Sequence, residues 1–244
     1  MGSMKKWGIL GAEEHEIRLL TAAMAEVRTE EIAGQRYYDG ILSGRPVTVA
    51  RCGIGKVCAA VGTQILIDRF GAKALWNLGA AGGAAPGLQI GSFAVCTDAV
   101  QYDFDATAFG YVPGYMCTGE DRQQPTRYAA DAQLRRAFCQ KAQRLFPQVQ
   151  VVEGTIATGD RFVNDPRLKQ ELYSRYGAVA AEMEGAAAAQ TAVLNGIPFL
   201  VVRAVSDLAD GGATESYNTF CERVSEQLSQ LLIALAGDPE PEET

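Results

Sequence analysis

Short apolar runs alternate along the chain with longer stretches in which apolar residues recur at helical spacing. Most of the runs end at Gly, Ser or an acidic residue, which is typical of buried strands that are followed by turns. This alternation predicts an α/β fold, a three-layer αβα sandwich with a central mixed sheet and helices on both faces. The predicted strands are Trp7–Gly11, Tyr37–Leu42, Val47–Arg51, Ala74–Leu78, Ser92–Val100, Val151–Ala157, Val179–Glu182 and Phe199–Val205.

Helical periodicity fills most of the intervals between these strands. After the first strand, apolar residues from Ile17 to Val27 lie at roughly helical spacing, and the acidic residues before them suit the positive end of a helix dipole. The other predicted helices are Val57–Phe70, Asp131–Leu145, Arg167–Tyr176, Gly185–Asn195 and Ser216–Leu235.

One long irregular stretch, from Ala106 to Arg127, interrupts the pattern. A connection of that length in a compact domain is usually functional or disordered. Because it carries Phe109, Tyr111 and Tyr115, we expect it to close over an apolar ligand or to contact a second subunit.

Length and composition fit one large domain. The 244 residues, of which 48% are hydrophobic, can bury a substantial core. We assign residues 4–236 to this single domain, since no linker or second core is evident. The opening Met-Gly-Ser of residues 1–3 resembles an expression scar, and the Pro/Glu-rich tail 237–244 is predicted to be disordered.

The charge of the chain narrows the possible partners. A formal net charge of -7 with no Lys/Arg-rich block argues against nucleic acid. No apolar run reaches membrane-spanning length and no signal peptide opens the chain, so we expect a cytoplasmic protein without a membrane partner. The six cysteines lack C-x-x-C spacing and are predicted to be reduced thiols.

The single histidine, His15, also limits the chemistry. One histidine excludes a three-histidine metal site and an H-E-x-x-H site. A Ser-His-Asp triad would need His15, which has three acidic neighbours and no nucleophile motif nearby.

Two carboxylates, Glu182 and Glu184, interrupt an otherwise small and apolar run from Ala178 to Ala189. Burying a carboxylate is costly unless a partner compensates, and here the acids precede a predicted helix whose first N–H groups are unpaired. They therefore lie at the carboxyl end of a strand, where open α/β sheets hold their ligands. An acidic cap on an ordinary helix is the alternative.

Other acids follow strands in the same way. Glu16 comes after the first strand and Asp207 after the last. If the sheet is largely parallel, these acids meet Glu182 and Glu184 at one edge. A cleft with several carboxylates and no histidine or metal suits cleavage of a glycosidic bond, in which one acid protonates the leaving group and another activates water.

Two glycine-rich turns flank these acids. The segment Cys52-Gly53-Ile54-Gly55-Lys56 lacks the spacing of a phosphate loop and is interpreted as a close-packed turn from strand to helix. The segment from Gly79 to Gly83 either lets a ligand approach the backbone or simply turns the chain.

Seven motifs together resemble one family, the 5'-methylthioadenosine/S-adenosylhomocysteine nucleosidases of the purine nucleoside phosphorylase superfamily. The resemblance runs from about Trp7 to Leu235, and the order and spacing of the motifs make it specific. The motifs are Gly11-Ala12-x-x-x-Glu16, Cys52-Gly53-Ile54-Gly55-Lys56, Gly79-x-Ala81-Gly82-Gly83, Thr107-Ala108-Phe109-Gly110-Tyr111, Gly159-Asp160-x-Phe162-Val163-Asn164, Ala181-Glu182-Met183-Glu184 and Val202-Arg203-Ala204-Val205-Ser206-Asp207.

The resemblance implies hydrolysis of the N-glycosidic bond of 5'-substituted adenine nucleosides with release of adenine. Glu16 would be the general base for the attacking water. Asp207, held by Ser206, would protonate N7 of adenine, so burial and neighbouring acids are expected to raise its pKa. Glu184 would bind the ribose hydroxyls, with Glu182 in support.

The resemblance also implies the rest of the binding site. Met183 would pack beneath the sugar, Phe162 would stack on adenine and the Val163 backbone would bind the base edge, with Ala81 and Gly82 also lining the site. Phe109 would come from the partner subunit of a homodimer and cover the 5' substituent, with Tyr217 nearby. The family uses no metal and no cofactor.

Two positions depart from the family pattern. Glu13 stands where an apolar Met is common, and Ala80 stands where Ser is common. Both would line the sugar and 5' side, and we expect the Glu13 carboxylate to point toward solvent rather than bind a polar 5' group.

Two alternative functions are less consistent with these residues, and a third remains open. A purine nucleoside phosphorylase needs positive charge or N–H donors for phosphate, which the acidic segment Glu13 to Glu16 would repel. A non-catalytic nucleoside-binding protein would not need Glu16 and Asp207 together. An aminofutalosine-type hydrolase would differ only in the 5' substituent.

Overall fold

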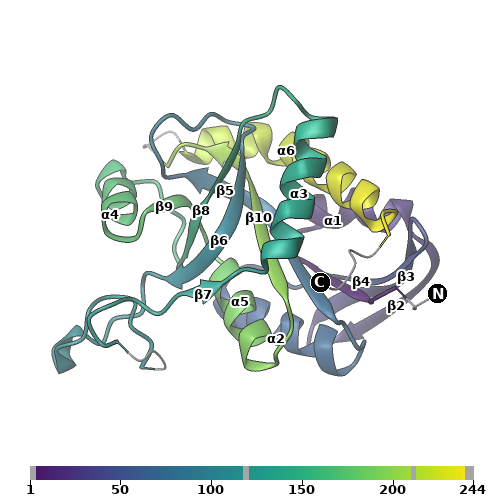
Figure 1. The fold of residues 1–244 in the computed structure, drawn as a ribbon, viewed down its shortest axis with the longest axis horizontal. Coiled ribbons are helices and arrows are strands. Elements are labelled where there is room, and N and C mark those ends of the chain that lie inside the picture. The colour runs from purple at the N-terminus through teal and green to yellow at the C-terminus, as the bar shows by residue number, and fades with distance from the viewer. Residues whose placement is uncertain (1–3, 118–120, 210–212, 240–244) are drawn as a thin grey trace.

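The computed structural model describes residues 4–117, 121–209 and 213–239. Its sheet and helices form the layers seen in Figure 1. The strands are β1 Trp7–Gly11, β2 Ala25–Ile32, β3 Gln35–Leu42, β4 Arg45–Arg51, β5 Ala74–Gly83, β6 Phe93–Gln101, β7 Tyr128–Ala129, β8 Val151–Thr158, β9 Ala178–Glu182 and β10 Phe199–Asp207. The helices are α1 Glu14–Ala23, α2 Lys56–Asp68, the 3₁₀ turn η1 Thr107–Phe109, α3 Ala132–Leu145, α4 Pro166–Tyr176, α5 Gly185–Leu194 and α6 Ala213–Ala236.

The strands form one mixed sheet in the order β10-β6-β8-β9-β5-β1-β4-β3-β2. An additional pairing of β10 with β5 closes the strands β5, β10, β6, β8 and β9 into a ring. In this ring β5 and β9 are antiparallel and pair only through Gly82 with Ala181 and Gly83 with Ala180. The carboxyl ends of β5 and β9 therefore meet, and β1 and β10 run parallel to β5 on its flanks.

Helices cover both faces of this sheet, which confirms the predicted three-layer architecture (Figure 1). α1, α3 and α6 lie on one face, and α2 and α5 lie on the other. α5 begins with Gly185 and four buried alanines, Ala186 to Ala189, so that its backbone approaches the sheet closely. Among the described residues, no α-helix has both the length and the apolar character that crossing a membrane requires.

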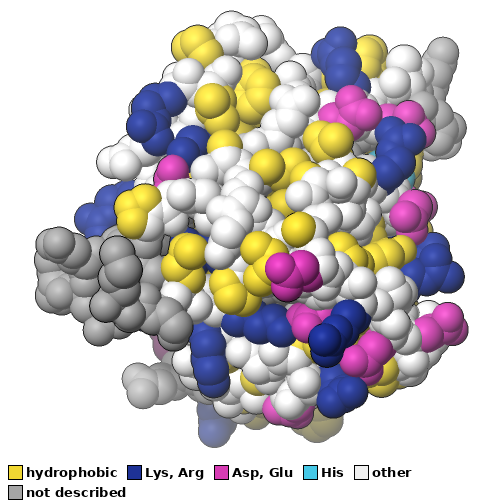
Figure 2. Space-filling model, turned by 90° about the vertical axis from the view of Figure 1, so that its right-hand side faces the viewer, with side chains coloured by type: hydrophobic (Ala, Val, Ile, Leu, Met, Phe, Trp, Pro, Cys, Tyr) yellow, Lys and Arg dark blue, Asp and Glu magenta, His cyan; other side chains and the backbone are white. Residues whose placement is uncertain are grey.

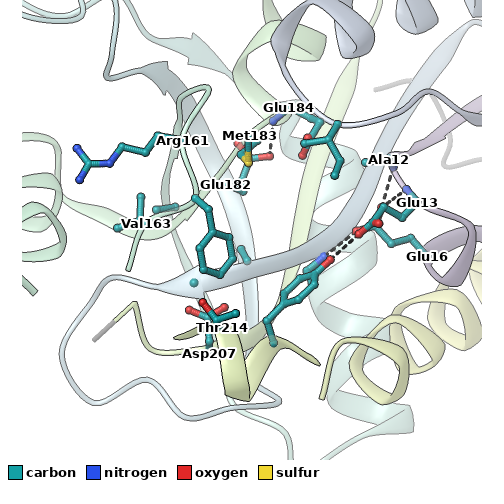
Figure 3. Close-up of a pocket in the computed structure, with 17 residues that line it drawn as sticks. Ala12, Glu13, Glu16, Arg161, Val163, Glu182, Met183, Glu184, Asp207 and Thr214 are labelled. Carbon is teal, nitrogen blue, oxygen red and sulfur yellow. Dashed lines mark hydrogen bonds between the residues drawn. The ribbon is translucent and has the colours of Figure 1, made fainter. Parts of the chain in front are cut away.

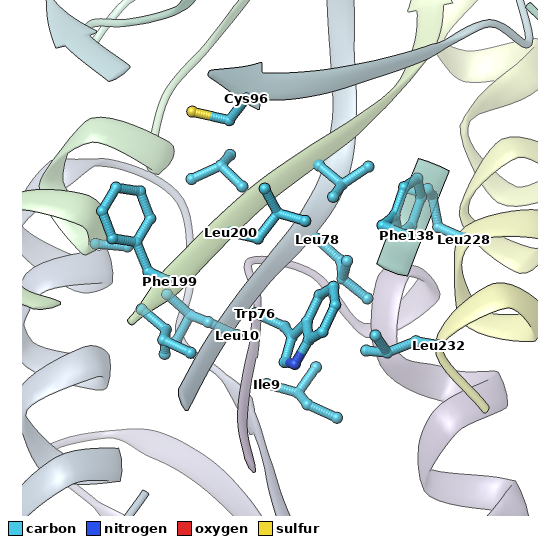
Figure 4. Close-up of a cluster of buried hydrophobic side chains, with 14 of the residues drawn as sticks. Ile9, Leu10, Trp76, Leu78, Cys96, Phe138, Phe199, Leu200, Leu228 and Leu232 are labelled. Atoms are coloured by element: carbon cyan, nitrogen blue, oxygen red, sulfur yellow. The ribbon is translucent and has the colours of Figure 1, made fainter. Parts of the chain in front are cut away.

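The core packs on both faces of β1, β5 and β10, against α3 and α6 on one side and against α2 and α5 on the other (Figure 4). Ile9, Leu10, Trp76, Phe199 and Leu200 project from the strands and are at most 1% exposed. Burying a side chain of this size stabilises the fold by about 1.5–3 kcal/mol. Phe138 of α3 and Leu228 and Leu232 of α6 complete this cluster.

The sequence prediction was wrong at two elements. The first helix does not reach Val27 but ends at Ala23, and Ala25–Ile32 forms the edge strand β2, which pairs with β3. β2 is polar and largely exposed, so it carries no alternating apolar signal. The glycine-rich segment after Leu78 does not leave the sheet, because its residues extend β5 by pairing with β10 and β9.

The edge formed by β2 carries charged side chains of both signs. Figure 2 views the molecule from the side of β2, β3 and β4 and shows acidic and basic groups interspersed with hydrophobic ones. Charged side chains on an edge strand discourage pairing with another chain. β2 therefore completes the sheet without presenting a flat apolar edge.

The two chain ends fall mostly outside the described residues. Residues 1–3, predicted to be an expression scar, and residues 240–244 of the predicted disordered tail are among those not described. The first residues of that tail are placed, and Asp238 accepts hydrogen bonds from Arg45 and Lys141.

Candidate active site

A pocket of about 420 Å³ opens where the carboxyl ends of β1, β5, β9 and β10 converge. Its volume lies in the range of small-molecule sites. Figure 3 shows carboxylates entering it from several elements. The lining residues are Ala12, Glu13, Glu16, Ile54, Ala80, Ala81, Gly82, Arg161, Phe162, Val163, Ala181, Glu182, Met183, Glu184, Asp207, Thr214 and Tyr217.

Glu16 in the first turn of α1 is held by backbone donors. Its Oε2 accepts hydrogen bonds from Ala12 N at 2.7 Å and Glu13 N at 3.0 Å, and its Oε1 accepts one from Ala80 N at 3.0 Å. Gly79 makes this possible, because a Cβ there would lie 2.5 Å from Oε1. A carboxylate has about four acceptor sites. Three donors therefore fix the group and leave one site for a water or ligand.

Glu182 at the end of β9 is held by both side-chain and backbone donors. Its Oε2 accepts from Arg203 Nε at 3.1 Å, from Arg203 Nη2, and from Glu184 N and Gly185 N at 3.0 and 2.7 Å. Its Oε1 accepts from the Thr158 hydroxyl. Both Glu182 and Arg203 are buried. This pair compensates the buried charge and caps the start of α5.

Glu184 reaches the pocket from the corner between β9 and α5. Its Oε1 accepts a hydrogen bond from Gly55 N at 2.8 Å. Gly55 has φ of +99°, a conformation that residues with a Cβ rarely adopt. The predicted strand-to-helix turn at Gly53–Lys56 therefore supplies the N–H that holds Glu184.

Burial, together with the charge of Glu182, raises the pKa of Glu184 to about 8. Arg203 opposes this shift. The guanidinium of Arg203 lies directly against Glu182. Perturbed carboxyls of this kind are frequent where an enzyme binds or transforms a substrate.

Asp207 ends β10 and is 1% exposed. Its Oδ1 accepts a hydrogen bond from Ala209 N at 2.9 Å, and Ser206 Oγ lies 3.0 Å from its Oδ2. Ser206 Oγ also lies 3.3 Å from the Ala81 carbonyl oxygen. A hydroxyl has one proton. Ser206 can therefore donate to Ala81 and accept from Asp207, or donate to Asp207 directly.

Apolar and aromatic groups line the rest of the pocket. Phe162 is 43% exposed, and its ring centroid lies 6.0 Å from that of Tyr217 at 81° in an edge-to-face arrangement. Val163 is buried beside it, and Met183 lies between the two glutamates of β9 and α5. A flat ligand can therefore stack on Phe162 while its polar edges meet the carboxylates.

The structure brings most of the sequence-predicted site residues together. Ten of the twelve line the pocket: Glu16, Ala81, Gly82, Phe162, Val163, Glu182, Met183, Glu184, Asp207 and Tyr217.

Two predicted residues do not line this pocket. Ser206 is buried behind Asp207. Phe109 lies in η1, is 80% exposed and is absent from the lining of its own chain's pocket.

The orientation expected for Glu13 was wrong. Its carboxylate lines the pocket rather than pointing to solvent, and its Oε2 accepts a hydrogen bond from the Tyr217 hydroxyl at 2.6 Å. The partner lies 204 residues away in sequence, so the pairing could not be seen from either local pattern.

Sequence reasoning also missed lining residues. Ile54 and Arg161 lie within two of the family motifs but were not predicted to line the site. Thr214, which also lines it, precedes Tyr217 by three residues on α6. Their only sequence signal is this proximity to assigned residues. Among the described residues that line the pocket, Arg161 is the single basic one, against five carboxylates.

Comparisons with known proteins agree with this geometry. The family model of the phosphorylase superfamily matches residues 6–236. A 5'-methylthioadenosine/S-adenosylhomocysteine nucleosidase from Exiguobacterium sp. is 39% identical over 94% of this chain and 97% of its own length.

Solved structures of nucleosidases and related hydrolases are also similar to this chain. The nucleosidase of that name from Neisseria meningitidis, in complex with methylthio-immucillin-A, has a TM-score of 0.88 at 36% identity and covers 96% of this chain and 99% of its own. A futalosine hydrolase from Helicobacter pylori has a TM-score of 0.88 at 29% identity and covers 95% of this chain and 97% of its own.

Proposed function

Because the chain belongs to the phosphorylase superfamily, we propose that it hydrolyses the N-glycosidic bond of 5'-substituted adenine nucleosides and releases adenine. The substrate class includes 5'-methylthioadenosine, S-adenosylhomocysteine and 5'-deoxyadenosine, and the relatives named for the first two support this assignment. The main support for this proposal is that Glu16, Glu184 and Asp207 all line one nucleoside-sized pocket.

Asp207 is proposed as the general acid at the base end of the pocket. A proton passed from its carboxyl to N7 of adenine makes the departing base neutral, which lowers the barrier to breaking the glycosidic bond. Ser206 orients the Asp207 carboxyl from behind. Phe162 stacks on the base, and the Val163 backbone lies at its edge.

Glu184 and Glu16 are proposed to act at the ribose. As adenine leaves, C1' takes on oxocarbenium character. This positive charge favours the ionised form of Glu184, whose carboxylate then stabilises it in a site shielded from water. Glu184 also accepts hydrogen bonds from the ribose hydroxyls, with Met183 packed beneath the ring and Glu182 holding the corner. Glu16 uses its remaining acceptor site to take a proton from the attacking water.

The charge of the pocket favours water over phosphate as the nucleophile. Five carboxylates face a single basic residue, Arg161, among the described lining residues. A phosphate dianion needs cationic groups or N–H donors, and the N–H groups near α1 are already directed at Glu16.

Omission of phosphate tests the choice between hydrolysis and phosphorolysis. In phosphate-free buffer, 5'-methylthioadenosine is expected to give adenine and the free 5-methylthio sugar at full rate. Adenine release that requires phosphate and gives a sugar 1-phosphate would identify a phosphorylase instead.

We also propose a homodimer in which Phe109 of each subunit covers the 5' end of its partner's pocket. Phe109 is 80% exposed, and exposed apolar residues lie on α2 beside the pocket, among them Val57 at 74% and Val61 at 37%. Aromatic residues are enriched at protein interfaces, which supports this placement of Phe109.

A reducing compartment, the cytoplasm, is proposed for this protein. All six cysteines lie in the described part of the chain, and each is a free thiol. Free thiols persist where the environment is reducing.

A further inference from the structure

One wall of the pocket contains a partly buried hydrogen bond that the proposed reaction does not use. The Tyr217 hydroxyl of α6 donates to Glu13 Oε2 at 2.6 Å, and both residues line the pocket. Figure 3 shows Glu13 beside Glu16 and across the pocket from Asp207. We call these two residues the Glu13–Tyr217 pair.

If the substrate binds as in the proposed function, the Glu13–Tyr217 pair lies beside its 5' substituent. Asp207, Phe162 and Val163 define the base end of the pocket, and Glu184 and Met183 define the ribose. Glu13 precedes Glu16 by three residues at the start of α1, and Tyr217 meets the edge of Phe162 from α6. The wall that remains for the 5' group therefore contains the Glu13–Tyr217 pair.

The pair offers only acceptors to a ligand. The single hydroxyl proton of Tyr217 is committed to Glu13, so the phenolic oxygen retains only lone pairs. Burial and the Glu13 hydrogen bond raise the pKa of Tyr217, which keeps that proton in place. The Glu13 carboxylate has further acceptor sites and a negative charge. A 5' substituent that lies against this wall is therefore bound best when it supplies a hydrogen-bond donor.

A 5'-alkylthio group does not meet this condition. A thioether has no donor and its sulfur is only a weak acceptor, so it would displace water from Glu13 without replacing the lost hydrogen bonds. A hydroxyl supplies one donor, and a protonated amine supplies several donors and the opposite charge, which makes charge-assisted hydrogen bonds.

We propose that the Glu13–Tyr217 pair is a specificity determinant that selects adenine nucleosides whose 5' substituent carries a hydrogen-bond donor, above all a cationic amine, over 5'-alkylthio nucleosides.

The test compares kcat/KM for three probes: 5'-methylthioadenosine, adenosine and 5'-amino-5'-deoxyadenosine. In the unmodified enzyme, the amino compound is expected to exceed 5'-methylthioadenosine. Glu13→Met removes the acceptor. It is expected to lower the kcat/KM for the amino compound relative to that for 5'-methylthioadenosine by about 10–100-fold. A ratio measured within one variant does not depend on the fraction of protein that is folded.

Two further variants separate specificity from structure. Glu13→Gln keeps the shape of the side chain but removes its charge. Relative to 5'-methylthioadenosine, it is expected to lower kcat/KM for the amino compound more than kcat/KM for adenosine. Glu14→Gln is the matched control, because Glu14 is the exposed neighbour that does not line the pocket. Its substrate ratios are expected to equal those of the unmodified enzyme.

The outcomes distinguish this inference from the proposed function. If adenine is released from 5'-methylthioadenosine but the substrate ratios are the same in Glu13→Met and the unmodified enzyme, the inference is wrong and the proposed function stands. If no probe releases adenine, the proposed function itself is wrong.

Discussion

Arg203 places both its Nε and its Nη2 against a single oxygen of Glu182, at a point where both side chains are buried. The same oxygen also accepts from the backbone N–H groups of Glu184 and Gly185. The guanidinium is held in turn by Asn77, whose side chain accepts from Nη2 at 2.6 Å. This ion pair therefore fixes the corner from which Glu184 enters the pocket.

Removal of the guanidinium is expected to destabilise the protein strongly. Arg203→Met leaves the Glu182 carboxylate buried without its countercharge, which costs about 3–5 kcal/mol in systems of this kind. Urea denaturation measures the free energy of unfolding. The double variant Glu182→Gln/Arg203→Met, which removes the uncompensated charge, is expected to recover part of the loss. Equal stability of the single variant and the unmodified protein would contradict this role.

Glu184 is expected to make stability fall as pH rises. Its pKa is about 8 in the folded protein, against an ordinary value of 4.5. Between these values the folded state holds a proton that the unfolded chain has lost. The contribution is therefore fully present below about pH 4.5 and is lost as pH rises through 8.

The variant Glu184→Gln isolates this contribution. Relative to Glu184→Gln, the unmodified protein is expected to lose about 2–4 kcal/mol of unfolding free energy between pH 5 and 8. Denaturation of both proteins at several pH values gives the difference. Parallel stability curves over this range would show that the carboxyl ionises normally in the fold.

A methyl group at Gly79 is expected to impair catalysis more than folding. An added Cβ would lie 2.5 Å from Glu16 Oε1, so Gly79→Ala must displace the carboxylate from its backbone donors. We expect kcat to fall about 10²-fold, since misplacement of a catalytic group by about 1 Å has effects of this size. Gly237→Ala, whose nearest neighbour would lie at 3.4 Å, is the control. An unchanged kcat in Gly79→Ala would remove Glu16 from the reaction.

Phe109 provides a test of the proposed dimer. Phe109→Ala is expected to raise KM about 10-fold, because each site loses the apolar cover from its partner. Mixed dimers of Phe109→Ala and Asp207→Asn chains contain one site with both Asp207 and the partner's aromatic ring. Co-expression is therefore expected to restore activity above the sum of the two variants. A monomeric protein by light scattering, or strictly additive activities, would contradict the proposal.

The layered fold could be predicted from the sequence because most strands are buried apolar runs with clear ends. β2 could not, since its exposed polar residues resemble the continuation of an amphipathic helix, and only pairing with β3 makes Ala25–Ile32 extended. Likewise, Gly79 to Gly83 resembled a turn, and β10 and β9 hold it in the sheet.

The acids of the site could be predicted because each follows a strand. Which atoms hold them could not, because the donors are distant in sequence: Ala80 N for Glu16 and Gly55 N for Glu184. Glu13 shows the same limit. The local sequence predicts an exposed carboxylate, but the hydroxyl of Tyr217, on the last helix, donates a hydrogen bond to it.

Adenine release by Asp207→Asn is the most direct test of the central claim, that distant carboxylates act together on one nucleoside. Asn keeps the size of the side chain but has no acidic proton to transfer to N7. With 5'-methylthioadenosine in phosphate-free buffer, the rate is expected to fall by about 10²–10⁴-fold while circular dichroism and the melting temperature stay near those of the unmodified protein. Turnover within a few-fold of the unmodified enzyme would contradict the account.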